Sequence, residues 1–125
     1  MRLLLDTQVF VWITQDSTHL SKAARALVLD ASEVYVSAAS IWEIAIKARL
    51  GKIDADPQRM ALAIAESGFS ELPITAQHAA GVALLPEHHK DPFDRLLIAQ
   101  ALAEPLRLVS SDSQLTQYSD LVIHI

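Results

Sequence analysis

Acidic side chains directly follow short apolar segments at two places in this sequence. Asp6 comes after the run Leu3–Leu5, and Asp112 comes after the segment Arg107–Ser111. A short polar residue at such a point often serves only as the N-cap of the next helix. If the two segments are neighbouring parallel strands, however, both carboxylates emerge at one edge of a sheet, where α/β proteins bind ligands. These positions leave capping and ligand binding both open.

A third acidic residue, Glu43, lies in a segment that is apolar on nearly every side. Ser40, Glu43 and Lys47 fall at i, i+3 and i+7 of a predicted helix, on one narrow polar stripe. One interpretation is a solvent-facing stripe in which Glu43 and Lys47 form an i, i+4 ion pair. The other is a helix buried on both flanks whose stripe points into an acidic pocket. The spacing favours neither.

The segment Asp91–Asp94 reads Asp-Pro-Phe-Asp and predicts the start of a helix. Asp91 fits the N-cap and Pro92 the first helical position. Asp56–Pro57 starts another predicted helix in the same way, so capping alone explains Asp91. It explains Asp94 less well, because Glu or Gln is the usual reciprocal partner in a capping box. Asp94 also leads into an apolar helix, which places it where a helix N-terminus meets a buried sheet edge.

These acids are suited to metal-assisted hydrolysis of a phosphodiester. Such a reaction neutralises a phosphate oxygen, activates water and stabilises a leaving oxyanion, all of which divalent ions can do. Hard ions such as Mg²⁺ or Mn²⁺ prefer carboxylate oxygen. We therefore take Asp6, Asp94 and Asp112 as candidate metal ligands, and Glu43 as a ligand or a general base.

Hydrophobic periodicity predicts the elements that must position these residues. Extended segments are expected at Leu3–Leu5, Glu33–Ser37, Leu72–Ile74, Arg107–Ser111 and Leu121–Ile125. Helices are expected over Thr7–Gln15, from Ser21, over Ser40–Leu50, from Asp56 to Gly68, over Thr75–Leu85 and from Asp91 to about Ala103, with a short turn after Asp112. Strands that alternate with helices need crossover connections. The prediction is an α/β fold with a mainly parallel sheet covered by helices on both faces.

Length and composition agree with one soluble domain spanning 1–125. The chain has 125 residues, of which 51% are hydrophobic and 20% charged, a composition that folds. No apolar stretch approaches the roughly 20 residues of a membrane helix. Asp6 ends the first apolar run before a signal-peptide core can form, so a cytoplasmic protein is expected. The absence of cysteine excludes thiolate catalysis and zinc held by sulfur.

The net charge of −5, from 10 basic and 15 acidic residues, argues against a general nucleic-acid coat. It does not exclude a metal-dependent nuclease, whose site concentrates carboxylates. Basic side chains for an RNA-contacting rim are Lys47, Arg49 and Arg95, with Lys52 and Lys90 beside them. For any one of these residues taken alone, ordinary surface solvation is the favoured interpretation.

Four segments, in order over essentially the whole chain, together resemble a PIN domain of the VapC toxin type. They are Leu3–Thr7, Ser37–Ile44, Asp91–Ala101 and Ser110–Asp112. The resemblance implies a three-layer α/β/α fold and a Mg²⁺- or Mn²⁺-dependent endoribonuclease, the toxin of a toxin–antitoxin pair. Its expected partners are an RNA substrate and a cognate antitoxin protein.

The resemblance also assigns site residues. It places the acidic catalytic quartet of the family at Asp6, Glu43, Asp94 and Asp112. Ser110 stands where many relatives have Thr, which keeps a hydroxyl near the site. Asp91 matches a feature of one subgroup, and whether it touches metal or only caps a helix is left open.

Two other classes of function compete with this one. A phosphoryl-accepting receiver domain needs paired acids after its first strand and a Lys after a late strand, but Thr7 follows Asp6 and the late strand ends in Ser110 and Ser111. A non-catalytic partner-binding module would use the acids only as caps. The apolar run Val9–Ile13 leaves its helix with no obvious solvent face, which indicates burial against another chain or a homodimer partner.

The pair His88–His89 also suggests a separate transition-metal site with Asp91, because histidine is a common metal ligand. Adjacent histidines seldom point at one ion, and this pair lies in a polar loop. Surface exposure or contact with substrate phosphate is the favoured interpretation.

Overall fold

The computed structural model describes residues 1–125 and is built on one five-stranded sheet. The strands are β1 (Arg2–Leu5), β2 (Glu33–Ser37), β3 (Ser70–Leu72), β4 (Arg107–Ser110) and β5 (Val122–His124). They lie in the order β3-β2-β1-β4-β5, and every neighbouring pair is parallel. The predicted parallel sheet is therefore confirmed. Because β1 and β4 are neighbours, Asp6 and Asp112 emerge close together at its carboxyl edge.

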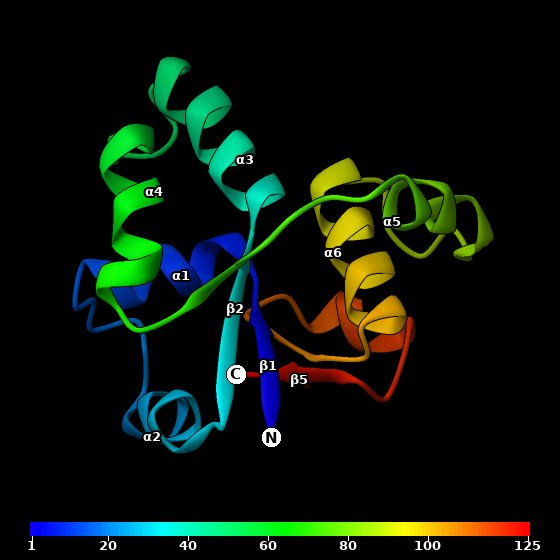
Figure 1. Cartoon of the computed structure of the whole chain (residues 1–125), viewed down its shortest axis with the longest axis horizontal. Coiled ribbons are helices and arrows are strands. Elements are labelled where there is room, and N and C mark those ends of the chain that lie inside the picture. Colours follow the sequence, from blue (N-terminus) through cyan, green and yellow to red (C-terminus); the bar gives the residue numbers. More distant parts are fainter.

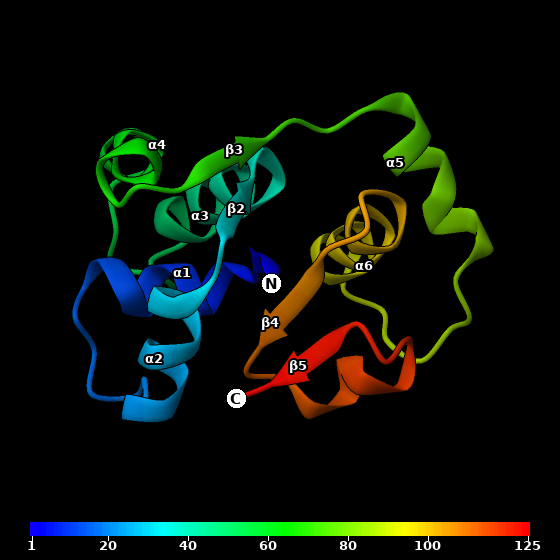
Figure 2. The ribbon, with the colours of Figure 1, turned by 60° about the horizontal axis from the view of Figure 1, so that its bottom comes forward.

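Helices cover both faces of the sheet. The helices are α1 (Thr7–Thr14), α2 (Lys22–Asp30), α3 (Ala38–Arg49), α4 (Pro57–Glu66), α5 (Ala76–Gly81) and α6 (Pro92–Ala103), with 3₁₀ turns η1 (Val82–Leu84) and η2 (Ser113–Gln117). In Figures 1 and 2, α1 to α4 lie on one side of the strands, and α5 and α6 lie on the other. This is the expected three-layer α/β/α arrangement.

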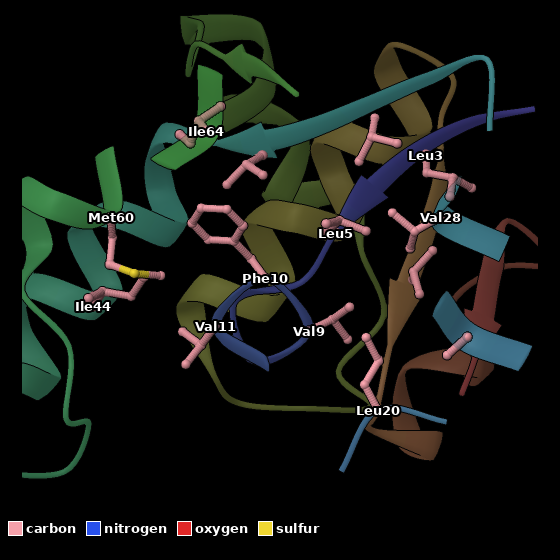
Figure 3. Close-up of a cluster of buried hydrophobic side chains, with 14 residues drawn as sticks. Leu3, Leu5, Val9, Phe10, Val11, Leu20, Val28, Ile44, Met60 and Ile64 are labelled. Carbon is pink, nitrogen blue, oxygen red and sulfur yellow. The ribbon is translucent and has the colours of Figure 1, made fainter. Parts of the chain in front are cut away.

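Two hydrophobic clusters follow from the alternation of side chains along β1. Leu3 and Leu5 point to one face and join a cluster with α1, α2, α3 and α4. Leu4 points to the other face and joins a cluster with α6, β4 and η2. Figure 3 shows Phe10 of α1 inside the first cluster, together with Leu5 of β1 and Ile64 of α4.

The apolar helix α1 is buried within its own chain. Val9 and Phe10 are fully buried, Val11 is 3% exposed, and Trp12 stacks on His19 at 5.4 Å between ring centroids. The run Val9–Ile13 suggested burial against another chain or a homodimer partner, but Val9, Phe10 and Val11 are buried by the sheet and by α2, α3 and α4 of the same chain, so that reason for a partner was wrong. The run gives no argument for a homodimer.

Several element boundaries differ from those expected. The third strand is Ser70–Leu72 rather than Leu72–Ile74, since Pro73 has no backbone N–H for a further ladder bond. The helix expected over Thr75–Leu85 ends at Gly81 and continues only as η1. Helix α3 begins at Ala38, two residues earlier than predicted, because the Ser37 hydroxyl accepts from the Ala39 amide and caps it.

Gly51 closes α3 with φ +73°, the left-handed conformation that its lack of a side chain permits. No helix of the structure has the length and apolar composition needed to cross a membrane.

Candidate metal and nuclease site

A cavity of about 230 Å³ opens at the carboxyl edge of the sheet, and half of its ten lining residues are acidic. The helices α1 and α6 and the turn η2 all begin here, while α3 passes along one wall. The lining residues are Asp6, Thr7, Gln8, Glu43, Lys47, Ile53, Asp91, Asp94, Ser111 and Asp112. The structure thus brings all four acids of the predicted quartet, and Asp91, to one place.

Asp6 is the most deeply held of the aspartates, with 5% of its surface exposed. Its Oδ1 accepts a 2.8 Å hydrogen bond from the Val9 amide, which makes it the N-cap of α1. Its Oδ2 accepts a 2.6 Å bond from the Ser110 hydroxyl. Burial raises the pKa of Asp6, the bonds from Ser110 and Val9 oppose that rise, and the charge of Glu43 adds to it.

Ser110, the last residue of β4, connects two of the acids. Its hydroxyl donates to Asp6 and accepts a 3.0 Å bond from the Asp112 amide. The side chain is fully buried. Ser110 therefore orients the Asp6 carboxylate and fixes the turn that carries Asp112.

Glu43 reaches the cavity from α3. The residues of the predicted polar stripe face inward: Ser40 is 1% exposed and Glu43 5%. The Thr7 hydroxyl donates to Glu43 Oε1 at 2.5 Å, and Lys47 donates to Oε2 at 2.6 Å. The ion pair with Glu43 raises the pKa of Lys47, which keeps its positive charge beside the acids. Of the two interpretations of the stripe, the inward-facing one is correct, and the i, i+4 pair forms within it.

Asp91 and Asp94 take different positions at the start of α6. Asp91 Oδ1 accepts a 2.9 Å bond from the Asp94 amide, so Asp91 is the N-cap as its sequence context predicted. The Asp94 carboxylate instead accepts a 3.0 Å bond from His89 Nε2. Burial, and then the Asp91 carboxylate, raise the pKa of Asp94 to about 6, although the bond from His89 lowers it.

Asp112 caps η2 through a 2.9 Å bond between its Oδ1 and the Gln114 amide. Its Oδ2 lies 3.5 Å from the same His89 Nε2. Sequence reasoning missed this role of His89 and grouped it with His88 instead. His88 is exposed and packs edge-on against Tyr118, with ring centroids 5.1 Å apart. The usable signal was the position of His89 just before a helix start at the edge where the acids gather.

The basic residues expected at an RNA rim divide into two groups. Arg49, Lys52 and Lys90 are exposed. Arg95, in contrast, donates to the Pro86 carbonyl at 2.9 Å and the Tyr118 hydroxyl at 3.2 Å, and it also reaches the carbonyls of Val82 and Leu85. Its guanidinium holds the loop that leads into α6, so we leave Arg95 out of the rim.

The donor set of this cavity suits a hard divalent cation. Carboxylate oxygens converge from the ends of two neighbouring strands and from the start of α6, and only the ammonium of Lys47 offsets them within the lining. Such clustered anions repel one another unless a cation lies between them. The fold and the site therefore define an α/β protein with an acidic cavity at the carboxyl edge of its sheet.

Comparisons with known proteins narrow this class. The family model described as "PIN domain" matches residues 3–121. The chain is 33% identical over 118 residues to Ribonuclease VapC22 of Mycobacterium tuberculosis, covering 93% of this chain and 91% of that protein. This chain belongs to the PIN domain family, as its motifs suggested.

Solved structures share the fold at lower identity. A toxin–antitoxin complex from Klebsiella pneumoniae contains a chain that is 20% identical with a TM-score of 0.69, over 98% of this chain and 99% of that one. VapBC2 from Rickettsia felis, bound to a DNA fragment from its promoter, contains one that is 17% identical with a TM-score of 0.71, over 100% and 98%. At these identities the likeness establishes the fold.

Proposed function

We propose that this protein is a divalent-metal-dependent endoribonuclease and the toxin of a toxin–antitoxin pair. The observation that carries the proposal is the convergence of Asp6, Glu43, Asp94 and Asp112 on one cavity at the carboxyl edge of the sheet. Its relative in Mycobacterium tuberculosis is named a ribonuclease, and it matches over nearly the full length of both chains.

The proposed ligands are Asp6, Asp94 and Asp112. When bound, Mg²⁺ or Mn²⁺ supplies charge neutralisation at the scissile phosphate and acidifies water. Asp6 is positioned for this role by Ser110, which leaves its carboxylate no freedom to rotate away. The raised pKa of Asp94, about 6, still leaves the group ionised at neutral pH and so able to bind a cation.

Glu43 has a different surrounding and, in this proposal, a different task. Thr7 and Lys47 donate to its two carboxylate oxygens and fix its orientation. A carboxylate held in this way can accept a proton from water in the cavity. Lys47 also places a positive charge beside the anionic substrate, and the exposed Arg49 and Lys52 extend that charge past the end of α3.

An antitoxin partner fits the exposed apolar surface of the chain. Trp42, Leu50 and Leu62, on or beside α3 and α4, are 58%, 61% and 62% exposed, and we assign them to the surface that an antitoxin would cover. The solved relative from Klebsiella pneumoniae is part of a toxin–antitoxin complex. The homodimer expected from the sequence stays a prediction that light scattering of the free protein will test.

The experiment is cleavage of a mixed RNA by the purified full chain across a Mn²⁺ series. We expect internal cuts that need the metal and disappear with excess chelator. The Asp6→Asn variant, folded by circular dichroism, should cut at least a hundredfold more slowly, and Asp120→Asn, outside the cavity, is the matched control. If parent protein and Asp6→Asn behave alike, or if RNA stays intact at every Mn²⁺ concentration, the nuclease assignment fails and a metal-indifferent binding module is the better account.

A further inference from the structure

We propose that His89 supplies a nitrogen ligand to the divalent cation, together with Asp94 and Asp112, so that the site prefers Mn²⁺ over Mg²⁺. The inference rests on the proposed metal-dependent function and adds a ligand from outside the acidic quartet. The observation behind it is one atom, His89 Nε2, which lies 3.0 Å from Asp94 Oδ2 and 3.5 Å from Asp112 Oδ2.

The spacing of these three atoms is that of ligands around one ion. One ligand atom from each of His89, Asp94 and Asp112 lies within 4.8 Å of the other two. Two adjacent ligands, each about 2.1 Å from an octahedral cation, lie about 3.0 Å apart. The two distances from His89 Nε2, 3.0 Å and 3.5 Å, are near this value, so these three side chains could hold one cation between them.

The loop that carries His89 is held in place by contacts on both sides. The Tyr118 hydroxyl donates to the His89 carbonyl at 3.3 Å. Arg95 donates to the carbonyl of Pro86 at the start of the loop and to the same Tyr118 hydroxyl. Asp91, two residues after His89, is fixed as the cap of α6. These contacts hold the imidazole, 23% exposed in its side chain, beside Asp94 and Asp112.

The ligand type determines which metal the site takes. Mn²⁺ accepts carboxylate oxygen as Mg²⁺ does, but it is also a first-row transition ion, the weakest binder of that series, and can add an imidazole nitrogen, whereas Mg²⁺ prefers oxygen ligands and retains its water. A site made of two carboxylates and one imidazole should therefore have a higher ratio of Mn²⁺ to Mg²⁺ affinity than a site made of carboxylates alone. The competing explanation is that His89 only pairs with the two acids, in which case a bound metal must displace it.

Pulsed electron paramagnetic resonance of the Mn²⁺-loaded full chain separates these two explanations. We expect nitrogen modulation from a coordinated imidazole in the parent protein and in His88→Gln, and its loss in His89→Gln. The matched control is informative because His88 is the neighbouring histidine and has no contact with the acids. The parent spectrum alone tests coordination, even if a variant folds poorly.

Mn²⁺ and Mg²⁺ titrations by calorimetry give a second measurement. His89→Gln should weaken Mn²⁺ binding by at least the 10- to 100-fold that changes to outer-shell partners of a metal cause. Mg²⁺ binding should weaken less, so the ratio of the two affinities should fall. If His89 only pairs with the two acids, the His89→Gln variant should instead bind Mn²⁺ as tightly as the parent protein or more tightly.

The outcomes also distinguish this inference from the proposed function. The role of His89 is overturned if Mn²⁺ binds without nitrogen modulation, or if the modulation persists in His89→Gln. Either result is still compatible with a metal site made of carboxylates alone. A parent protein that binds neither Mn²⁺ nor Mg²⁺ overturns both proposals.

Discussion

The Asp94 carboxylate destabilises the metal-free fold when it is ionised, and this cost can be measured. Burial and the neighbouring Asp91 raise its pKa from an ordinary 3.8 to about 6. Between about pH 4 and 6 the folded protein holds a proton that the unfolded chain has released. The free energy of unfolding contributed by this group is therefore highest below pH 4 and is lost as the pH rises through about 6.

The magnitude follows from the size of that pKa change. Each pKa unit is worth about 1.4 kcal/mol, so complete ionisation of Asp94 costs about 3 kcal/mol. The side chain is 22% exposed, and solvent screening reduces the figure. We expect Asp94→Asn to raise the free energy of unfolding by about 1–3 kcal/mol at pH 7 in chelator and to change it little at pH 4.

Urea denaturation at a series of pH values from 4 to 8 is the assay. Asp120→Asn, at an exposed aspartate of the turn before β5, is the control and should show no such pH-dependent gain. Excess Mn²⁺ at pH 7 should reverse the order of stability, because the cation binds the parent carboxylate and not the amide. The reasoning is refuted if Asp94→Asn is less stable than the parent at pH 7 in chelator, or if its gain is the same at pH 4.

Three other substitutions test the assignment of roles within the cavity. Expression without a partner should arrest bacterial growth, and folded Asp6→Asn should relieve the arrest; undiminished toxicity of that variant in a growth assay would contradict the role of Asp6. Asp91→Ser keeps an oxygen for the cap, so its melting temperature and cleavage rate should stay near those of the parent, whereas Asp94→Asn should fold and lose cleavage by orders of magnitude; the reverse result would exchange cap and ligand. Asp112→Asn should raise the melting temperature in chelator and gain less from added Mn²⁺ than the parent, and equal metal-induced shifts would count against a ligand at this position.

The positions of Asp6 and Asp112 could be predicted from the sequence because both depend on local signals. Each residue follows a short apolar run, and the alternation of strands with helices implies that neighbouring strands are parallel. Parallel strands end at the same edge, so the two carboxylates were expected to emerge together if their strands were neighbours, as β1 and β4 are. The start of α6 could also be predicted from the sequence, because Asp is favoured at the N-cap of a helix and Pro at its first position.

The orientation of α3 and the place of His89 could not be predicted in this way. The stripe of Ser40, Glu43 and Lys47 has the same spacing whether it faces water or the cavity, and only packing against α1, α4 and α6 decides between them. His89 lies in a loop whose course depends on contacts of Arg95 and Tyr118. Periodicity carries no information on contacts between residues so far apart along the chain.

Capping a helix and binding a metal are not exclusive roles for an aspartate, because one carboxylate has two oxygens and each can serve one role. In Asp6 and Asp112, Oδ1 accepts from a helix amide, while Oδ2 is directed to Ser110 in one case and to His89 in the other. The cap fixes the rotamer and so aims the second oxygen. The helix N-termini also place partial positive charge beside the acids, which offsets part of their mutual repulsion by about 0.3–1 kcal/mol each.

Because one oxygen caps a helix and the other can bind a cation, the choice of substituting residue decides whether a variant tests the cap or the ligand. Asn at positions 6 or 112 keeps an oxygen for the amide and removes the charge that a cation requires, so the fold should survive while metal binding falls. Ala at either position removes the cap as well, at a typical cost of about 1 kcal/mol to stability. Loss of activity in an Ala variant therefore cannot separate a misplaced helix from a missing ligand, whereas the Asn variant tests the ligand alone.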